Sequence, residues 1–157
     1  MFEKPAPDGD KKNSNGYLLV DTGVIICHLR NLPGVKDLLQ QLAAHTFFAV
    51  SAVTLVEIWQ GAKPAEAEKT RLLLQAFEVF PLNQVVAERA GHLTRGLRTK
   101  GFSLDLADAV IGATALQIGA PILTTNRKHF ISIPNLEVLD LQTLLTENNK
   151  YKHGSGK

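Results

Sequence analysis

Four short, mainly apolar runs occur along this chain, and each has the length of a β-strand. They cover residues 17–20, 47–50, 121–124 and 136–139. Such runs are typical of strands that are buried on both faces, as in a parallel sheet. A weaker apolar pair at residues 79–80, closed by Pro81, predicts one further short strand.

Between these runs, apolar residues recur at helical spacing. Val35, Leu38, Leu39 and Leu42 stand at i, i+3, i+4 and i+7, which predicts an amphipathic helix. Five further helices are expected, over residues 52–61, 65–77, 86–100, 106–118 and 141–146. Strands that alternate with helices favour an α/β fold, with right-handed crossovers and a parallel sheet covered by helices on both faces.

The two ends of the chain differ from its middle. Residues 1–16 contain almost nothing apolar and are predicted to be a disordered leader, and residues 147–157 are predicted to be a flexible basic tail. The body, residues 17–146, is expected to form one domain. The tail carries the whole formal net charge of +2, so the body is neutral and its overall charge says nothing about nucleic acid.

Composition excludes several classes of protein. The chain has 157 residues, of which 45% are apolar, too many for a disordered chain. Its one cysteine, Cys27, rules out an internal disulfide and a zinc site with several thiolates. Because no apolar run is long enough to cross a membrane and no signal peptide is visible, a cytoplasmic protein is expected.

Candidate chemistry gathers where strands are expected to end, because ligands of open parallel sheets bind beyond the carboxyl ends of the strands. Asp21 directly follows the first strand, and Asn126 stands two residues after the third long strand. Glu57 belongs to a helix that is apolar nearly all round, so this carboxylate is expected to be partly buried and to need a partner. Asp108 lies in the first turn of its helix.

Each of these residues also has a purely structural interpretation. An aspartate after a strand, such as Asp21, is often a turn or cap residue. Either Ser103 or Asp105 caps the helix over residues 106–118, with Asp108 completing its first turn. Asp105 therefore stays open as a cap or as an additional acid of a site.

If Asp21, Glu57 and Asp108 converge, three carboxylates share one crevice, and like charges that close require protonation or a cation. Oxygen ligands without a cluster of His or Cys suit Mg²⁺ or Mn²⁺ rather than zinc. A carboxylate-held ion of this kind is a recurrent device for attack of water on a phosphodiester. The Gly-rich phosphate loops and the Gly-x-Ser-x-Gly nucleophile turn are absent from the sequence.

Four blocks of the chain, in this order, resemble the PIN-domain ribonucleases and, within them, the VapC-type toxins of bacterial type II toxin–antitoxin modules. The blocks are residues 18–22, 51–61, 106–116 and 123–130, and the likeness extends over about residues 17–140. The resemblance implies an α/β/α sandwich around a five-stranded parallel sheet, with residues 79–80 at one edge. It also implies a site formed by Asp21, Glu57, Asp108 and Asn126.

The resemblance implies roles for these residues in a metal-dependent endoribonuclease. Asp21 and Asp108 would bind Mg²⁺ or Mn²⁺ most directly, Glu57 through a water or at a second ion, and Asn126 as a neutral oxygen ligand. Many family members have Asp in place of Asn126, and a Ser or Asn often supports the site where this chain has Gly23.

Partners follow from the same resemblance: an RNA substrate, a cognate antitoxin protein and a second copy of the chain. Trp59 is a candidate contact for that second copy, although a place in the core explains it equally well. Arg95, Arg98, Arg127 and Lys128 are candidates for RNA binding, although a solvated helix face explains the first two equally well. The alternative to a ribonuclease is a catalytically silent module of the same fold that binds RNA or protein.

Overall fold

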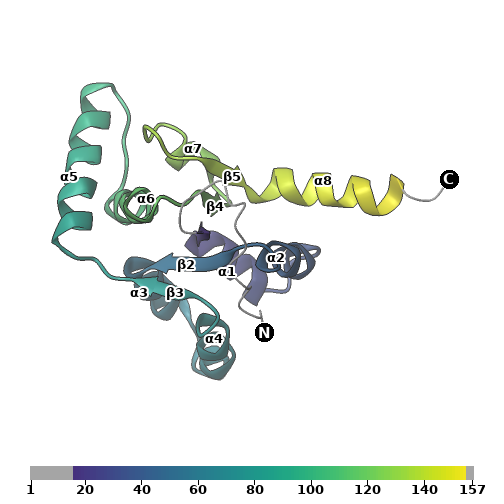
Figure 1. The fold of residues 1–157 in the computed structure, drawn as a ribbon. Helices are drawn as coiled ribbons and strands as arrows, with labels where there is room; N and C mark the ends of the chain where they lie inside the picture. The colour runs from purple at the N-terminus through teal and green to yellow at the C-terminus, as the bar shows by residue number, and fades with distance from the viewer. Residues whose placement is uncertain (1–15, 155–157) are drawn as a thin grey trace.

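The computed structural model describes residues 16–154 as a five-stranded sheet between two layers of helices (Figure 1). The strands are β1 (Tyr17–Val20), β2 (Phe47–Ser51), β3 (Glu78–Phe80), β4 (Ile122–Thr124) and β5 (Val138–Asp140). Their order in the sheet is β3-β2-β1-β4-β5, and every neighbouring pair is parallel. The predicted α/β class, the parallel pairing and the edge position of the short third strand are therefore confirmed.

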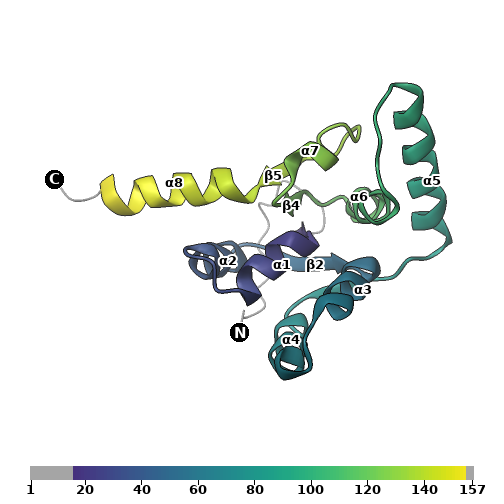
Figure 2. The same ribbon diagram turned by 180° about the vertical axis from the view of Figure 1, so that it is seen from behind.

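The helices divide between the two faces of the sheet, with α3 contributing to both cores. One face carries α1 (Thr22–Leu29), α2 (Val35–Ala43), α3 (Ala52–Gly61), the 3₁₀ turn η1 (Pro64–Glu66), α4 (Ala67–Leu74) and the start of α8 (Leu141–Gly154). The other face carries α5 (Gln84–Thr99), α6 (Leu106–Ile118) and α7 (Arg127–Phe130). Figures 1 and 2 show α5 standing outside α6, and α8 extending away from the sheet.

The central strand β1 supplies both cores. Leu18 and Val20 point into the core under α1 and α2, whereas Leu19 points into the core under α6. All three side chains are buried. This explains the uninterrupted apolar run in the sequence, since alternate residues of a strand face opposite sides of the sheet.

Four helical segments differ from the sequence-based expectation. The helices α1 and α7 were not predicted. The predicted helix over residues 65–77 is divided into η1 and the shorter α4, which ends at Leu74. The last helix continues to Gly154, so residues 147–154 of the predicted flexible tail are helical.

The start of the fold and the cap of α6 are both defined by hydrogen bonds. Residues 1–15 of the leader lie outside the described residues, but Gly16 belongs to the fold, because its carbonyl accepts hydrogen bonds from the Phe47 N–H and the Thr46 hydroxyl. Of the two proposed caps for α6, Asp105 is the one that forms the cap, and Gly119 ends the helix with φ 64°. Within residues 16–154, no helix is both long and apolar enough to cross a membrane.

Candidate active site

The carboxyl ends of β1 and β4 form the point at which the sheet order reverses. After β1, the strands β2 and β3 follow one another toward one edge of the sheet. The strands β4 and β5 then extend the sheet from the other side of β1. Ligands of such sheets bind in the crevice beyond this point. Asp21 leaves β1 here, and Thr124 is the last residue of β4.

Three hydrogen bonds hold Asp21 at this position. Its backbone N–H donates to the Leu123 carbonyl at 2.9 Å, and its Oδ1 caps α1 by accepting the Thr22 N–H at 2.8 Å. Its Oδ2 accepts the Thr124 hydroxyl at 2.7 Å. Burial raises the pKa of the Asp21 carboxyl above its usual value, the two hydrogen bonds oppose that change, and the nearby Glu57 charge adds to it.

Glu57 reaches the same place from α3. The Thr22 hydroxyl donates to Glu57 Oε2, so Thr22 joins the carboxylates of β1 and α3 through its own N–H and O–H groups. Glu57 is partly buried, as its apolar helix predicted, and Thr22 is the partner that the sequence did not identify.

Asp108 enters the crevice from the first turn of α6. Its N–H donates to Asp105 Oδ1 at 2.8 Å, which is the cap of the helix. Its own Oδ2 lies 2.6 Å from His129 Nδ1. Burial, the Asp105 charge and, to a smaller extent, the Asp21 charge raise the pKa of Asp108 to about 6, although His129 opposes the increase.

His129 connects Asp108 to Asn126. Asn126 Nδ2 lies 2.8 Å from His129 Nε2, and the Asn126 N–H donates to the Thr124 hydroxyl at 2.9 Å. Both ring nitrogens of His129 are therefore engaged, Nδ1 by the Asp108 carboxylate and Nε2 by the Asn126 amide. Since Thr124 also donates to Asp21, the hydrogen bonds run without a break from Glu57 to Asp108.

The structure therefore brings Asp21, Glu57, Asp108 and Asn126 into one hydrogen-bonded network, together with Asp105 as the helix cap. Three members of this network were not predicted from the sequence: Thr22, Thr124 and His129. His129 stands three residues after Asn126, the spacing of neighbours on a helix, but nothing in the sequence connects it with Asp108, which is 21 residues away.

The donor chemistry of this network fits a hard divalent cation. Its free acceptors are carboxylate and amide oxygens, and no Lys or Arg in the described part of the chain forms an ion pair with Asp21, Glu57 or Asp108. Burial and then the charges of Asp105 and Asp21 raise the pKa of Asp108, and a cation would relieve the repulsion between these charges. As the side chains stand, however, no three Asp, Glu, His or Cys groups of residues 16–154 are grouped so that they could hold one ion.

Gly23 stands where many family members have a supporting side chain, and in this chain Thr125 fills the neighbouring space. A Cβ atom built on Gly23 would lie 2.2 Å from the Thr125 hydroxyl oxygen. The hydroxyl of Thr125, just after β4, therefore fills the space that a side chain at position 23 would enter. A larger residue at position 23 requires Thr125 to turn away.

The four predicted RNA-binding residues lie on two helices. Arg127 and Lys128 directly follow Asn126 in α7, and both are exposed. Arg95 and Arg98 are exposed near the carboxyl end of α5, which packs against α6. None of the four forms an ion pair within the described residues, a property shared by solvated and by nucleic-acid-binding side chains.

Comparison with known proteins adds an independent observation. A model of the PIN domain matches residues 18–136. Ribonuclease VapC10 of Mycobacterium tuberculosis is 34% identical over 113 residues, which are 72% of this chain and 85% of that protein. Ribonuclease VapC1 of Methanocaldococcus jannaschii is 29% identical over 114 residues, 72% of this chain and 78% of that protein.

Solved structures agree with these matches. A toxin–antitoxin complex from Klebsiella pneumoniae contains a chain that is 31% identical, with a TM-score of 0.66 over 78% of this chain and 95% of that one. VapBC2 from Rickettsia felis, bound to a DNA fragment from its promoter, has a TM-score of 0.71 over 79% of this chain and 98% of that one. At 24% identity, that second likeness shows the fold alone.

Proposed function

This chain belongs to the PIN-domain family, and we propose that it is a metal-dependent endoribonuclease, the toxin of a toxin–antitoxin pair. The observation that carries this proposal is the network at the reversal point of the sheet, in which Asp21, Glu57 and Asp108 are joined through hydroxyl and imidazole groups. The reaction is hydrolysis of an RNA phosphodiester.

The ion is Mg²⁺ or Mn²⁺ in this proposal, because the available ligands are oxygens. Asp21 and Asp108 would hold it most directly, with Glu57 acting through a water or at a second ion and Asn126 as a neutral ligand. When bound, such an ion polarises the scissile phosphate and lowers the pKa of the attacking water.

The residues of the chain prepare the site for this reaction. Two hydrogen bonds fix both oxygens of Asp21, and Thr22 orients Glu57 from the same helix end. His129 orients Asp108 and Asn126 with its two ring nitrogens. Asp105 holds the first turn of α6, so its proposed role is to position Asp108 rather than to act as a further ligand.

A ribonuclease assay tests the proposal. Wild-type protein is expected to cleave single-stranded RNA with Mg²⁺ or Mn²⁺ and to stop in EDTA, whereas Asp21→Asn should be inactive under both conditions. Folding of the variant is checked by its melting temperature. Equal metal-dependent cleavage by the wild type and by a folded Asp21→Asn variant would contradict the proposal.

Two observations favour the second candidate, a catalytically silent binding module. Asp108 is engaged by His129, and the described carboxylates are not arranged as a ready ion site. RNA binding without any metal-dependent cleavage in the same assay would support this alternative.

We propose two protein partners and a location. An antitoxin is expected because a related chain was solved in a toxin–antitoxin complex. A second copy of the chain is expected on the outer side of α3, where Val56 and Trp59 are 64% and 39% exposed. The cytoplasm is the proposed location, since RNA is the proposed substrate.

A further inference from the structure

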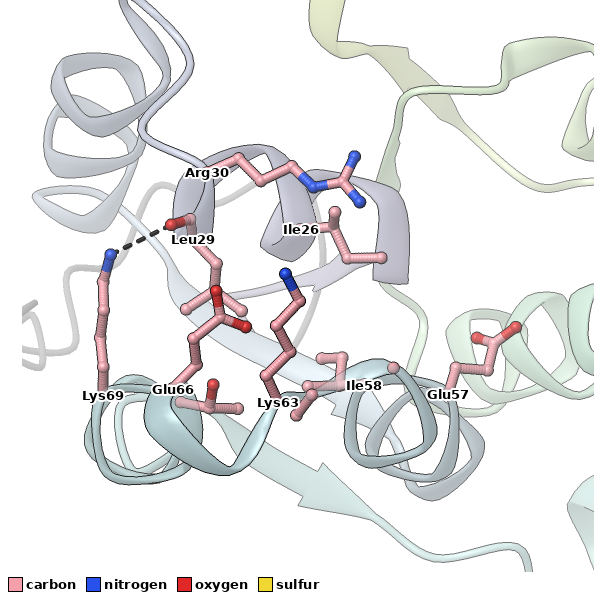
Figure 3. Close-up of a pocket in the computed structure, with 11 residues that line it drawn as sticks. Ile26, Leu29, Arg30, Glu57, Ile58, Lys63, Glu66 and Lys69 are labelled. Carbon is pink, nitrogen blue, oxygen red and sulfur yellow. Dashed lines mark hydrogen bonds between the residues drawn. The ribbon is translucent and has the colours of Figure 1, made fainter.

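A cavity of about 230 Å³ opens beside the carboxylate network, between α1 and the turn that joins α3 to α4 (Figure 3). Glu57 lines the cavity and belongs to the network through its hydrogen bond with the Thr22 hydroxyl, so cavity and network share this residue. Of the four predicted site residues, only Glu57 lines it. The predicted RNA-binding residues do not line it either.

The cavity is apolar at its base and charged at its rim. Ile26 of α1 and Ile58 of α3 contribute apolar surface. Arg30, at the end of α1, and Lys63, just before η1, extend their side chains into the space between the helices (Figure 3). Both residues are exposed, and neither forms an ion pair within residues 16–154.

The other charged groups of the cavity do not cancel these two cations. Lys69 is a third cation, and its ammonium group donates to the Leu29 carbonyl at 3.0 Å. The Glu57 carboxylate points away from Lys63 and is hydrogen-bonded by Thr22 (Figure 3). Glu66 is the remaining acid, so cations outnumber acids along this wall.

RNA is a polyanion, so a site that cleaves it with carboxylates needs positively charged side chains nearby. Uncompensated carboxylates repel the phosphates on either side of the scissile bond, whereas Lys and Arg attract them. Arginine is especially suited to contact a phosphate with two N–H groups. The apolar base of the cavity can meanwhile accept the less polar surface of a nucleotide.

On the premise of the ribonuclease function, we propose that this cavity is a subsite for the RNA strand, in which Arg30 and Lys63 bind a phosphate next to the scissile one. The occupant is a nucleotide of single-stranded RNA whose uncharged surface lies over Ile26 and Ile58. An acidic peptide from a protein partner is the competing occupant. Continuity of the cavity with the carboxylate network favours the substrate.

The salt dependence of RNA binding tests this subsite. Binding of a random-sequence, fluorescently labelled single-stranded RNA is measured in EDTA, so that no cleavage occurs, between roughly 50 and 200 mM salt. The variants are Arg30→Gln, Lys63→Gln and the double variant. Arg71→Gln on α4 and Lys150→Gln on α8 are matched controls, because both residues are exposed and lie outside the cavity.

Each single variant is expected to reduce the slope of log K against log salt by about 0.7, and the double variant by about 1.4. The controls should keep the wild-type slope. Slopes that remain at the wild-type value in all cavity variants would overturn the subsite and leave the ribonuclease proposal intact.

Two other outcomes also contradict the subsite. Variants that bind RNA normally but lose binding to the co-expressed antitoxin would assign the cavity to the protein partner. A wild-type protein that neither binds nor cleaves RNA would contradict the ribonuclease proposal as well.

Discussion

Asp108 is the residue whose protonation depends most visibly on its neighbours. Its pKa rises to about 6 because it is partly buried and faces the charges of Asp105 and Asp21. An aspartate with a higher pKa in the folded than in the unfolded chain binds more protons when folded. The free energy of unfolding therefore falls as the pH rises from about 4 to about 6.

Replacing this carboxylate should stabilise the metal-free protein. Asp108→Asn keeps an oxygen that can accept from His129 but removes the charge, so we expect equal stability near pH 4 and a gain of roughly 1–3 kcal/mol above pH 6, reduced by solvent screening. Thermal or urea unfolding in EDTA across this pH range provides the measurement.

The control for that experiment is Asp105→Asn, which retains a capping oxygen for α6 and removes only one source of repulsion. Its gain should have the same sign and be smaller. Marked destabilisation of Asp108→Asn at neutral pH would show that the carboxylate is needed for structure.

Individual site residues could be predicted only where position along a strand or helix identifies them. Asp21 directly follows a strand and Glu57 is a charge on an otherwise apolar helix, so the sequence indicates both. His129 is an exposed residue of α7, and it joins Asn126, at the start of the same helix, to Asp108 of α6. Such contacts depend on how α6 and α7 are placed, which local sequence patterns do not determine.

At the level of elements, apolar periodicity predicted the strands and the long helices but missed α1. This helix contains Gly23 and the β-branched run Val24–Ile26, which have weak intrinsic helix propensity. Tertiary packing compensates, because Val24 and Ile25 are buried against the sheet and Asp21 caps the first turn. A helix that is stabilised mainly by tertiary packing cannot be predicted from the helix propensity of its own residues.

The helix α3 shows a second limit of periodicity. Its residues are apolar nearly all round, yet only Thr54 and Ile58 are buried, and Val56 and Trp59 remain exposed. The sequence pattern was correct about the apolar surface but could not tell whether this chain or another molecule covers it.

The exposed side of α3 therefore predicts self-association. Sedimentation of the wild-type protein is expected to show a dimer, and Trp59→Glu should shift it toward monomer without lowering the melting temperature of the monomer, because this side chain is not part of the core. Leu72→Glu, at another exposed apolar position on α4, serves as the control. A monomeric wild type at high concentration would contradict the dimer.

For the whole molecule, the order of the strands explains why distant residues meet. Because β1 and β4 are neighbouring strands, the Thr124 hydroxyl donates a hydrogen bond to Asp21, although the two residues are 103 positions apart in the sequence. The net charge of residues 17–146 is zero and does not reveal how the charges are arranged. Carboxylates lie at the carboxyl ends of the strands, whereas Arg30 and Lys63 line the adjacent cavity. Net charge is uninformative here, and the distribution of charge is what matters for RNA.

The most direct test of the central claim is the single-turnover rate at which Asp108→Asn cleaves RNA with Mg²⁺ or Mn²⁺, measured beside its melting temperature in EDTA. If the carboxylate network performs the reaction, cleavage should fall by at least about 100-fold while the melting temperature stays the same or rises. Cleavage at the wild-type rate by a folded Asp108→Asn protein would contradict the account.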